Sequence, residues 1–267
     1  GGFMVPNLLN RMGVHCIKLF CDPSGYFPHN PEPLPENLTD ISQLVVAEKA
    51  DFGIVVDPDV DRLAFVCEDG SMFGEEYTLV SVSDYVLSKK PGNTVSNLSS
   101  TRALRDITEK YQGIYEASSV GEVNVVKKMK EINAVIGGEG NGGIIYPDLH
   151  YGRDALVGIA LFLTQLAERG MSVKEIRSSY PSYSISKNKI DLDEDIDIDS
   201  IISSLIKKYQ CEDINIVDGL KIDFEDGWVH LRKSNTEPII RIYAESLDAE
   251  RANFFAEMII NDIKAIV

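Results

Sequence analysis

Apolar residues along this chain follow two different periods, and the order of those periods limits the fold. Up to about residue 180, segments with the helical period alternate with short apolar runs typical of strands. In the first block the pattern predicts helices over 4–13 and 36–50 and strands over 15–21 and 52–56. Such alternation is typical of α/β domains, in which crossover helices join parallel strands.

After residue 180 the pattern changes to strands in series, backed by two helices. The expected strands are 185–192, 214–224, 227–233 and 238–246. One helix is expected over 200–210, between the first two strands, and another from residue 248, where Asp248 suits an N-cap. We therefore expect two α/β domains, with mixed or parallel sheets and crossover helices, followed by a smaller α+β domain with an antiparallel sheet. We place these three domains at residues 1–70, 71–181 and 182–267.

Composition narrows the possible partners. The formal net charge is -16 over 267 residues, so nucleic acid and anionic membranes would be repelled. No run reaches the roughly 18 apolar residues of a membrane span, the first residues carry no secretory signal, and the four cysteines form no C-x-x-C pair. We expect a cytoplasmic protein with reduced thiols, and the sequence predicts no oligomeric state. Because a helical pattern begins almost directly after Gly1, we also expect a longer protein in which a strand precedes this chain.

Three aspartates at alternate positions follow the apolar run at 52–56. Asp57, Asp59 and Asp61, which we call the aspartate cluster, would point to one side of an extended segment, where like charges repel unless a cation lies between them. Mg²⁺ prefers oxygen ligands and keeps positions open for water and a substrate phosphate. We expect the cluster to bind Mg²⁺, and Arg62 behind it to stabilise charge on a transferring phosphoryl group. The alternative is an ordinary acidic turn at a strand end.

A glycine-rich stretch, GGEGNGG at residues 137–143, lies between two apolar runs and is called the glycine segment below. Its glycines would let backbone approach a ligand closely. Glu139 and Asn141 offer acceptor and amide groups suited to sugar hydroxyls, so we expect Glu139, Asn141 and Gly142 to contact a sugar. The stretch has neither a Walker ending nor a dinucleotide-binding pattern, and a plain connection between strands is the alternative.

A predicted hairpin over 227–246 carries arginines on both sides of its turn. Pairing Arg232 opposite Ile239 would set His230 opposite Arg241 and leave both arginines on one face. Two guanidinium groups beside a hydroxyl-bearing turn would form a cradle for a substrate phosphate. The turn residues of this cradle are Ser234, Asn235 and Thr236. The alternative is a hairpin with solvated arginines.

Taken in order, these segments resemble the α-D-phosphohexomutases, a family that includes phosphoglucomutase/phosphomannomutase and phosphoglucosamine mutase. DPDVDR at 57–62 is similar to the family's metal loop, and GGEGNGG at 137–143 is similar to its sugar-recognition loop. RKSNTEP at 232–238, together with Arg241, is similar to its phosphate-binding loop. The resemblance extends over the whole chain.

The resemblance implies a Mg²⁺-dependent isomerase that interconverts hexose 1-phosphate and hexose 6-phosphate through a hexose 1,6-bisphosphate. In the family, a phosphoserine of the first domain, set in a Ser-His-Asn-Pro segment, donates the phosphoryl group. This chain has no such match, since Pro28 precedes its His29. The resemblance therefore implies most of domain two with domains three and four, a fragment inactive alone. Its substrate would be a small sugar phosphate, and the motifs leave glucose, mannose and glucosamine open.

Three positions depart from the family pattern. Gly143 stands where many members have a histidine, and Ser119 stands where they have a basic residue, so we expect the grip on the sugar to differ. Pro58 replaces the usual glycine of the metal loop without removing a ligand.

Two other functions fit parts of the sequence. An aspartyl phosphatase of the haloacid dehalogenase type would use Asp57, at the end of an apolar strand, as its nucleophile. That function leaves the glycine segment and the arginine hairpin without a role. A non-catalytic fragment that binds a phosphosugar would show binding without turnover.

Overall fold

A computed structural model describes residues 1–191, 198–233 and 239–266 of the chain. Their contacts divide the chain into two compact units. Unit 1 comprises residues 1–117 and 121–180, and unit 2 comprises residues 118–120 and 181–267. The predicted division into three domains stays a prediction.

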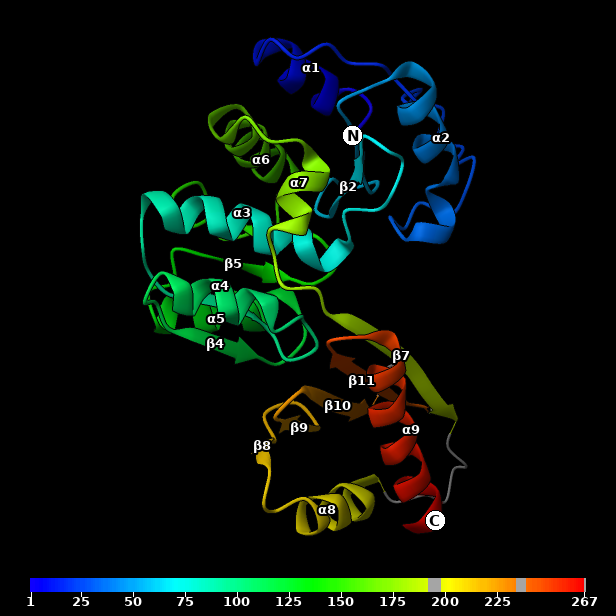
Figure 1. The fold of residues 1–267 in the computed structure, drawn as a ribbon, viewed down its shortest axis with the longest axis vertical. Coiled ribbons are helices and arrows are strands. Elements are labelled where there is room, and N and C mark those ends of the chain that lie inside the picture. Colours follow the sequence, from blue (N-terminus) through cyan, green and yellow to red (C-terminus); the bar gives the residue numbers. More distant parts are fainter. Residues whose placement is uncertain (192–197, 234–238, 267) are drawn as a thin grey trace. The chain divides into compact units, whose positions relative to one another are not determined.

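Unit 1 begins with short helices, which precede a pair of antiparallel strands (Figure 1). These elements are α1 (Met4–Arg11), the 3-10 helix η1 (Pro35–Asn37), α2 (Thr39–Glu48), β1 (Phe52–Val56) and β2 (Leu63–Cys67). Val56 pairs with Leu63, so residues 57–62 form the loop between β1 and β2. The strand expected over 15–21 is wrong, because among the described residues this segment pairs with no strand. An apolar run becomes a strand only when a neighbour takes up its backbone hydrogen bonds.

The rest of unit 1 is built on a four-stranded sheet with the order β4-β3-β5-β6. Its strands are β3 (Thr94–Asn97), β4 (Tyr115–Ser118), β5 (Ile136–Glu139) and β6 (Gly143–Ile145). β3 and β5 run parallel, whereas β5 and β6 run antiparallel. α3 (Glu75–Lys89) precedes these strands, and the helices that connect or follow them are α4 (Ala103–Lys110), α5 (Glu122–Glu131), α6 (Ala155–Arg169) and α7 (Val173–Ser178).

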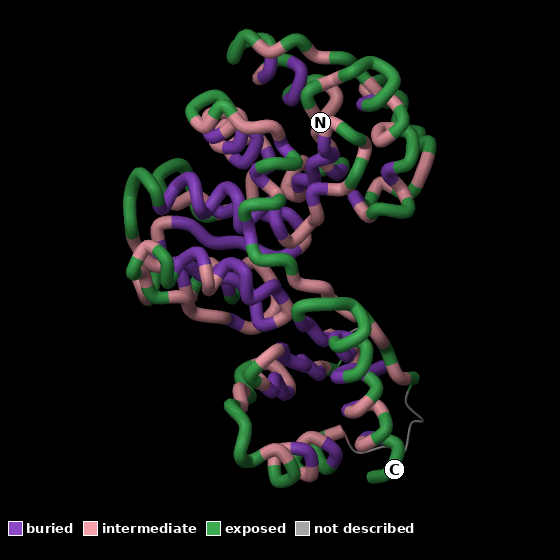
Figure 2. Tube along the Cα trace, viewed as in Figure 1, coloured by how far each residue is buried: buried purple, intermediate pink, exposed green. Residues whose placement is uncertain are grey.

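Helices cover both faces of this sheet. Two glycines of β5 show how closely the helices pack against it. A side chain at Gly137 would collide with Met129 of α5, whereas one at Gly138 would meet Leu79 of α3. Neighbouring residues of a strand point to opposite faces, so α3 and α5 lie on opposite sides of β5. The trace of α3 is buried along almost its whole length (Figure 2).

Helix α6 begins and ends where its sequence indicates. Asp154 accepts hydrogen bonds from the backbone N–H groups of Leu156 (2.7 Å) and Val157 (3.2 Å), which makes it an N-cap. Gly170 has a φ of +61°, the left-handed conformation that glycine adopts easily at a helix end. The start of α6 is thereby fixed beside the end of β6, where Asp154 N donates to the Ile144 carbonyl at 2.8 Å.

Unit 2 is a five-stranded antiparallel sheet with two helices on one face. Its elements are β7 (Ser184–Asp191), α8 (Ile198–Lys208), β8 (Asp213–Asn215), β9 (Leu220–Phe224), β10 (Gly227–Lys233), β11 (Ile239–Ser246) and α9 (Ala249–Ile266), with the strand order β7-β11-β10-β9-β8. Asp248 caps α9 by accepting from Arg251 N at 2.7 Å, as expected. Leu231 of β10 and Ile242 of β11 belong to the apolar core shared with α8 and α9. The predicted fold class is confirmed.

Within the described part of the chain, no helix combines the length and the apolar character needed to cross a membrane.

Candidate active site

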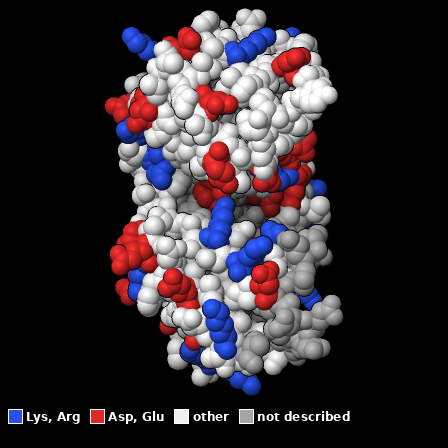
Figure 3. Space-filling view, turned by 90° about the vertical axis from the view of Figure 1, so that its right-hand side faces the viewer, with Lys and Arg blue, Asp and Glu red and all other residues white. Residues whose placement is uncertain are grey.

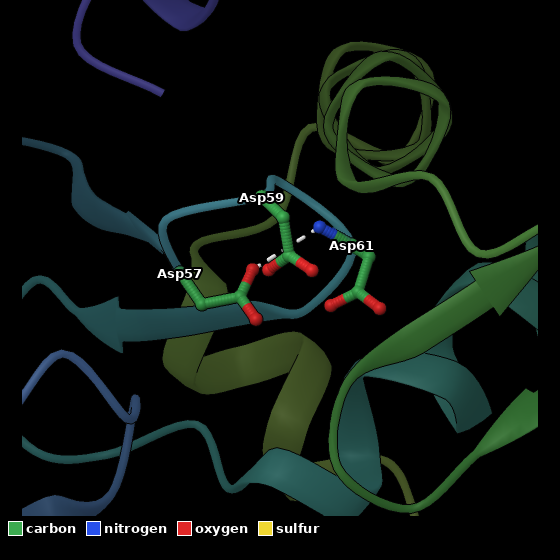
Figure 4. A group of neighbouring side chains, drawn as sticks. All are labelled: Asp57, Asp59 and Asp61. Atoms are coloured by element: carbon green, nitrogen blue, oxygen red, sulfur yellow. Dashed lines mark hydrogen bonds between the residues drawn. The ribbon is translucent and has the colours of Figure 1, made fainter. Parts of the chain in front are cut away.

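The loop between β1 and β2 brings the aspartate cluster together. Each of its three residues offers a carboxylate oxygen, and these oxygens all lie within 4.8 Å of one another (Figure 4). Asp57 folds the loop around itself, because its Oδ1 accepts hydrogen bonds from the backbone N–H groups of Asp61 (3.1 Å) and Arg62 (3.0 Å). Asp57 is buried and Asp59 is exposed. The cluster is therefore reachable from one side and anchored on the other.

Backbone strain lies within this loop. Val60 has a φ of +63°, a left-handed conformation that is an outlier for a β-branched residue. Its carbonyl accepts a hydrogen bond from Ala155 N at 3.0 Å, at the start of α6. Such strain persists only where the surroundings hold it, and it concentrates at functional sites.

The charges of the loop leave one oxygen without a partner. Asp61 Oδ1 is buried and accepts no hydrogen bond from the described residues. Arg62 Nε lies 4.0 Å from this oxygen and 3.6 Å from Asp57 Oδ2, and both distances are too long for hydrogen bonds. A buried carboxylate oxygen is costly unless a donor or a cation meets it. Three carboxylates with one such oxygen fit a hard divalent cation.

The glycine segment places Glu139 at the buried end of β5. Only 5% of Glu139 is exposed. Its Oε1 accepts from Asn97 Nδ2 at 2.9 Å and from Gly121 N at 3.1 Å. Asn141 is less buried, and its Oδ1 accepts from Gly143 N at 3.2 Å. These two of the three predicted sugar contacts therefore differ, since most acceptor positions of Glu139 are taken up within the fold.

Gly142 packs the glycine segment against the start of β2. Its φ is +84°, and a Cβ at this position would lie 2.0 Å from the carbonyl oxygen of Leu63. Leu63 N donates to the Gly142 carbonyl at 3.2 Å. Because Leu63 directly follows Arg62, the glycine segment and the aspartate loop lie side by side although they are far apart in sequence.

Arg153 joins these two segments and was not among the predicted site residues. Its Nη1 donates to Glu139 Oε2 at 2.8 Å, its Nε donates to Glu122 Oε2 at 3.2 Å, and its Nη2 donates to Asp61 Oδ2. Burial disfavours the charged guanidinium, but the surrounding carboxylates outweigh burial and raise the pKa of Arg153. The only local signal is its place in a Gly-Arg-Asp stretch whose aspartate, Asp154, is the N-cap of α6.

In unit 2 the arginine hairpin pairs in a different register from the predicted one. Arg232 lies opposite Arg241, and His230 lies opposite Tyr243. The predicted pairing of Arg232 with Ile239 is therefore wrong by two residues. A shift of two keeps every side chain on its face, so apolar alternation could not detect it. The predicted turn residues Ser234, Asn235 and Thr236 lie outside the described residues.

The two arginines share one face of the sheet, because residues directly opposite each other in an antiparallel pair point to the same side. Arg232 Nε is buried and has no hydrogen-bond partner among the described residues. A buried guanidinium nitrogen of this kind suits an anion.

Three models of one family match successive parts of the chain. Phosphoglucomutase/phosphomannomutase, alpha/beta/alpha domain II, matches residues 1–70, alpha/beta/alpha domain III matches residues 74–183, and the C-terminal domain matches residues 188–262. The chain belongs to the phosphoglucomutase/phosphomannomutase family. Its three predicted motifs lie, one each, in the three matched parts.

Several family members resemble the chain over almost all of its length. The chain is 33% identical over 269 residues to a probable phosphoglucosamine mutase of Methanopyrus kandleri, with 99% of this chain and 59% of the relative covered. It is 35% identical over 261 residues to a phosphoglucomutase/phosphomannomutase of Thermococcus kodakarensis, with 97% and 57% covered. The crystal structure of a phosphoglucomutase/phosphomannomutase family protein from Burkholderia thailandensis has a TM-score of 0.84 at 26% identity, with 99% and 58% covered. The chain thus spans less than two thirds of these relatives.

Proposed function

We propose that this chain carries the metal, sugar and phosphate sites of a Mg²⁺-dependent phosphohexomutase. The whole enzyme would interconvert hexose 1-phosphate and hexose 6-phosphate through a hexose 1,6-bisphosphate. The observation that carries the proposal is the aspartate cluster, whose oxygens lie within 4.8 Å of one another in a member of this family. Relatives are named for glucose, mannose and glucosamine phosphates, so all three are candidate substrates.

The aspartate cluster would hold the cation. Mg²⁺ bound there would polarise a phosphoryl oxygen and offset its charge. Arg62, whose side chain is 33% exposed, stands beside the cluster and would donate to the same phosphoryl group. The strained loop keeps the three carboxylates close before any ligand arrives, which favours binding because less ordering remains to be done.

Glu139, Asn141 and Gly142 would form the sugar site. Glu139 already receives three hydrogen bonds, so it keeps about one acceptor position for a hydroxyl. The amide of Asn141 can donate to another hydroxyl, and Gly142 keeps the segment against β2. In unit 2, Arg232 and Arg241 would bind a phosphate of the substrate. We propose Ser234, Asn235 and Thr236 as further donors to that phosphate.

The charge of the chain supports a small anionic substrate over a polyanion. The net charge is -16, and on the face drawn in Figure 3 Lys and Arg side chains lie among Asp and Glu side chains. A net charge of this sign and size would repel nucleic acid or an anionic membrane. A cytoplasmic location goes with this proposal.

Turnover tests the proposal directly. Glucose, mannose and glucosamine 1-phosphates are supplied with Mg²⁺ and a trace of the matching 1,6-bisphosphate, both to this chain and to a longer chain that includes the family's phosphoserine domain. We expect turnover only from the longer chain and its loss in Asp59→Asn. Asp51→Asn, the same change at an exposed aspartate outside the loop, is the control and should leave turnover unchanged.

Two results would replace the proposal. Release of free phosphate by this chain, with a trapped acylphosphate on Asp57, would establish the aspartyl phosphatase instead. Binding of sugar phosphates without turnover in the longer chain would leave a non-catalytic binding protein.

A further inference from the structure

Arg153 connects three segments that are distant in sequence. Its three guanidinium nitrogens donate separately to Asp61 of the aspartate loop, to Glu139 at the end of β5 and to Glu122 in the first turn of α5. The Arg153 side chain is 15% exposed. One guanidinium thus serves a proposed metal ligand and a proposed sugar contact at the same time.

The backbone of Arg153 is fixed on both sides. Arg153 forms an isolated antiparallel bridge with Ile145 of β6. The next residue, Asp154, is the N-cap of α6 and donates its own N–H to Ile144. With the backbone held in this way and Nε, Nη1 and Nη2 each bonded to a different carboxylate, the planar guanidinium has one defined orientation.

This orientation decides which oxygen of Asp61 is used. Arg153 takes Oδ2, while Oδ1 stays buried without a hydrogen-bond partner among the described residues. A carboxylate free to rotate would exchange its two oxygens or turn away from Asp57 and Asp59. Groups that hydrogen-bond to metal ligands orient those ligands in this way.

We propose that Arg153 is a positioning residue that holds Asp61 with Oδ1 available to a cation and holds Glu139 for a sugar hydroxyl. The inference rests on the proposed metal site. It adds that the Arg153 side chain connects this site to the proposed sugar site. Loading of the cation and the orientation of Glu139 would then depend on the same side chain.

Removing Arg153 should change metal affinity in opposite directions for the two roles that it could have, balancing charge or positioning a ligand. A cation that only balances nearby carboxylates also repels a second cation, so its removal should tighten metal binding. A residue that positions a ligand should weaken metal binding when it is removed. Arg153→Gln keeps a hydrogen-bonding side chain but removes the positive charge and the fork of guanidinium N–H donors.

The experiment measures Mn²⁺ binding by electron paramagnetic resonance, with Mn²⁺ standing in for Mg²⁺ because both prefer oxygen ligands in octahedral sites. The present chain and its Arg153→Gln and Arg153→Lys variants are compared. We expect Arg153→Gln to weaken binding by about 10-fold or more. Arg153→Lys should restore little of the loss, because one ammonium group cannot reproduce the fork to both carboxylates.

A matched control separates positioning from general loss of stability. Arg169→Gln removes another partly buried guanidinium of unit 1, which pairs with buried Asp84 at 2.5 Å away from the aspartate loop. It should lower the melting temperature and leave Mn²⁺ affinity unchanged. Equal or tighter Mn²⁺ binding by Arg153→Gln, with normal binding by the unaltered chain, would overturn the inference alone. An unaltered chain that binds no Mn²⁺ would overturn the proposed metal site as well.

Discussion

Arg232 lies directly opposite Arg241 in the antiparallel pairing of β10 with β11. Leu231, the neighbour of Arg232, belongs to the core beneath α8 and α9, so the arginine pair is on the face away from those helices. Like charges directly opposite each other in a sheet are destabilising. A bound dianion would offset that repulsion, which makes the stability of unit 2 a measure of phosphate binding.

We expect inorganic phosphate to stabilise unit 2 and Arg232→Gln to remove most of this effect. At a phosphate concentration about 100 times Kd, the unaltered chain should gain about 2.7 kcal/mol of unfolding free energy. The variant should gain only about 0.3–1.3 kcal/mol at the same phosphate concentration, because a hydrogen bond to a charged group contributes roughly 1.5–3 kcal/mol. Urea unfolding followed by the fluorescence of Trp228, the chain's single tryptophan and fully buried in unit 2, measures the gain.

The control for this experiment is Lys207→Gln, at an exposed position of α8. It removes the same charge from unit 2 without touching the arginine pair, so phosphate should stabilise it as much as the unaltered chain. Equal phosphate effects in Arg232→Gln and in Lys207→Gln would argue against a phosphate site at the hairpin.

Replacing Asp57 should destabilise the chain more than replacing Asp59, although both residues are expected to bind the cation. Without metal, Asp57→Ala should cost about 1–3 kcal/mol, because the backbone N–H groups of Asp61 and Arg62 lose their acceptor. Asp59→Ala removes an exposed carboxylate and should change stability by no more than about 0.5 kcal/mol. Calorimetry in the presence of a chelator measures the difference, and Mn²⁺ binding should be lost in both variants. Equal costs would show that Asp57 does not organise the loop.

The elements that local pattern determines could be predicted from the sequence. Apolar and β-branched runs mark the strands of unit 2, although the run expected as one strand over 214–224 forms two, β8 and β9. Asp248 marks a helix start by its capping carboxylate, and Gly170 marks a helix end by its left-handed backbone. The close approach of the three aspartates also follows from their spacing, although they meet in a strained turn at Val60 and not along an extended strand.

Features that depend on distant segments could not be predicted. The run at 15–21 has strand composition, yet no described strand lies beside it. The hairpin register could not be predicted, because a shift of two residues leaves every side chain on the same face of the sheet. The role of Arg153 could not be predicted, because its partners come from three separate segments that no spacing in the sequence brings together. These partners are Asp61, Glu122 and Glu139.

Replacement of Gly142 should disturb two segments at once. In Gly142→Ala the new Cβ would lie 2.0 Å from the Leu63 carbonyl oxygen, so the glycine segment must move away from β2. We expect a loss of more than about 3 kcal/mol of unfolding free energy, above the roughly 1–3 kcal/mol of a left-handed residue alone. Mn²⁺ binding should weaken too, because Leu63 follows the aspartate loop. Thermal unfolding and Mn²⁺ titration test both effects.

Gly170→Ala is the matched control for this substitution. Gly170 also has a positive φ (+61°), but a Cβ there would meet nothing within 4 Å. It should show the cost of backbone strain without the collision, and it should leave Mn²⁺ affinity unchanged. If the two variants lose equal stability, the packing of Gly142 on β2 contributes nothing.

The buried imidazole of His230 should make unit 2 sensitive to acid. His230 is 1% exposed, and since a carbonyl only accepts, its Nε2 donates to the Asp218 carbonyl at 2.7 Å. Burial lowers the pKa of His230 from 6.5 to about 4. Between these values the unfolded chain binds a proton that the folded chain does not. Stability therefore rises with pH through this window and is fully present only above the unfolded pKa.

Lowering the pH from about 7 to about 5 should therefore cost the unaltered chain about 2 kcal/mol more than it costs His230→Gln, given about 1.36 kcal/mol per pKa unit. Glutamine keeps an N–H donor for the Asp218 carbonyl but does not titrate. Urea unfolding at both pH values, again followed by Trp228, gives the two differences, and other titrating groups cancel because both chains share them. His15→Gln, at an exposed histidine of unit 1, should behave like the unaltered chain. The same loss in His230→Gln as in the unaltered chain would mean that folding does not lower the pKa of His230.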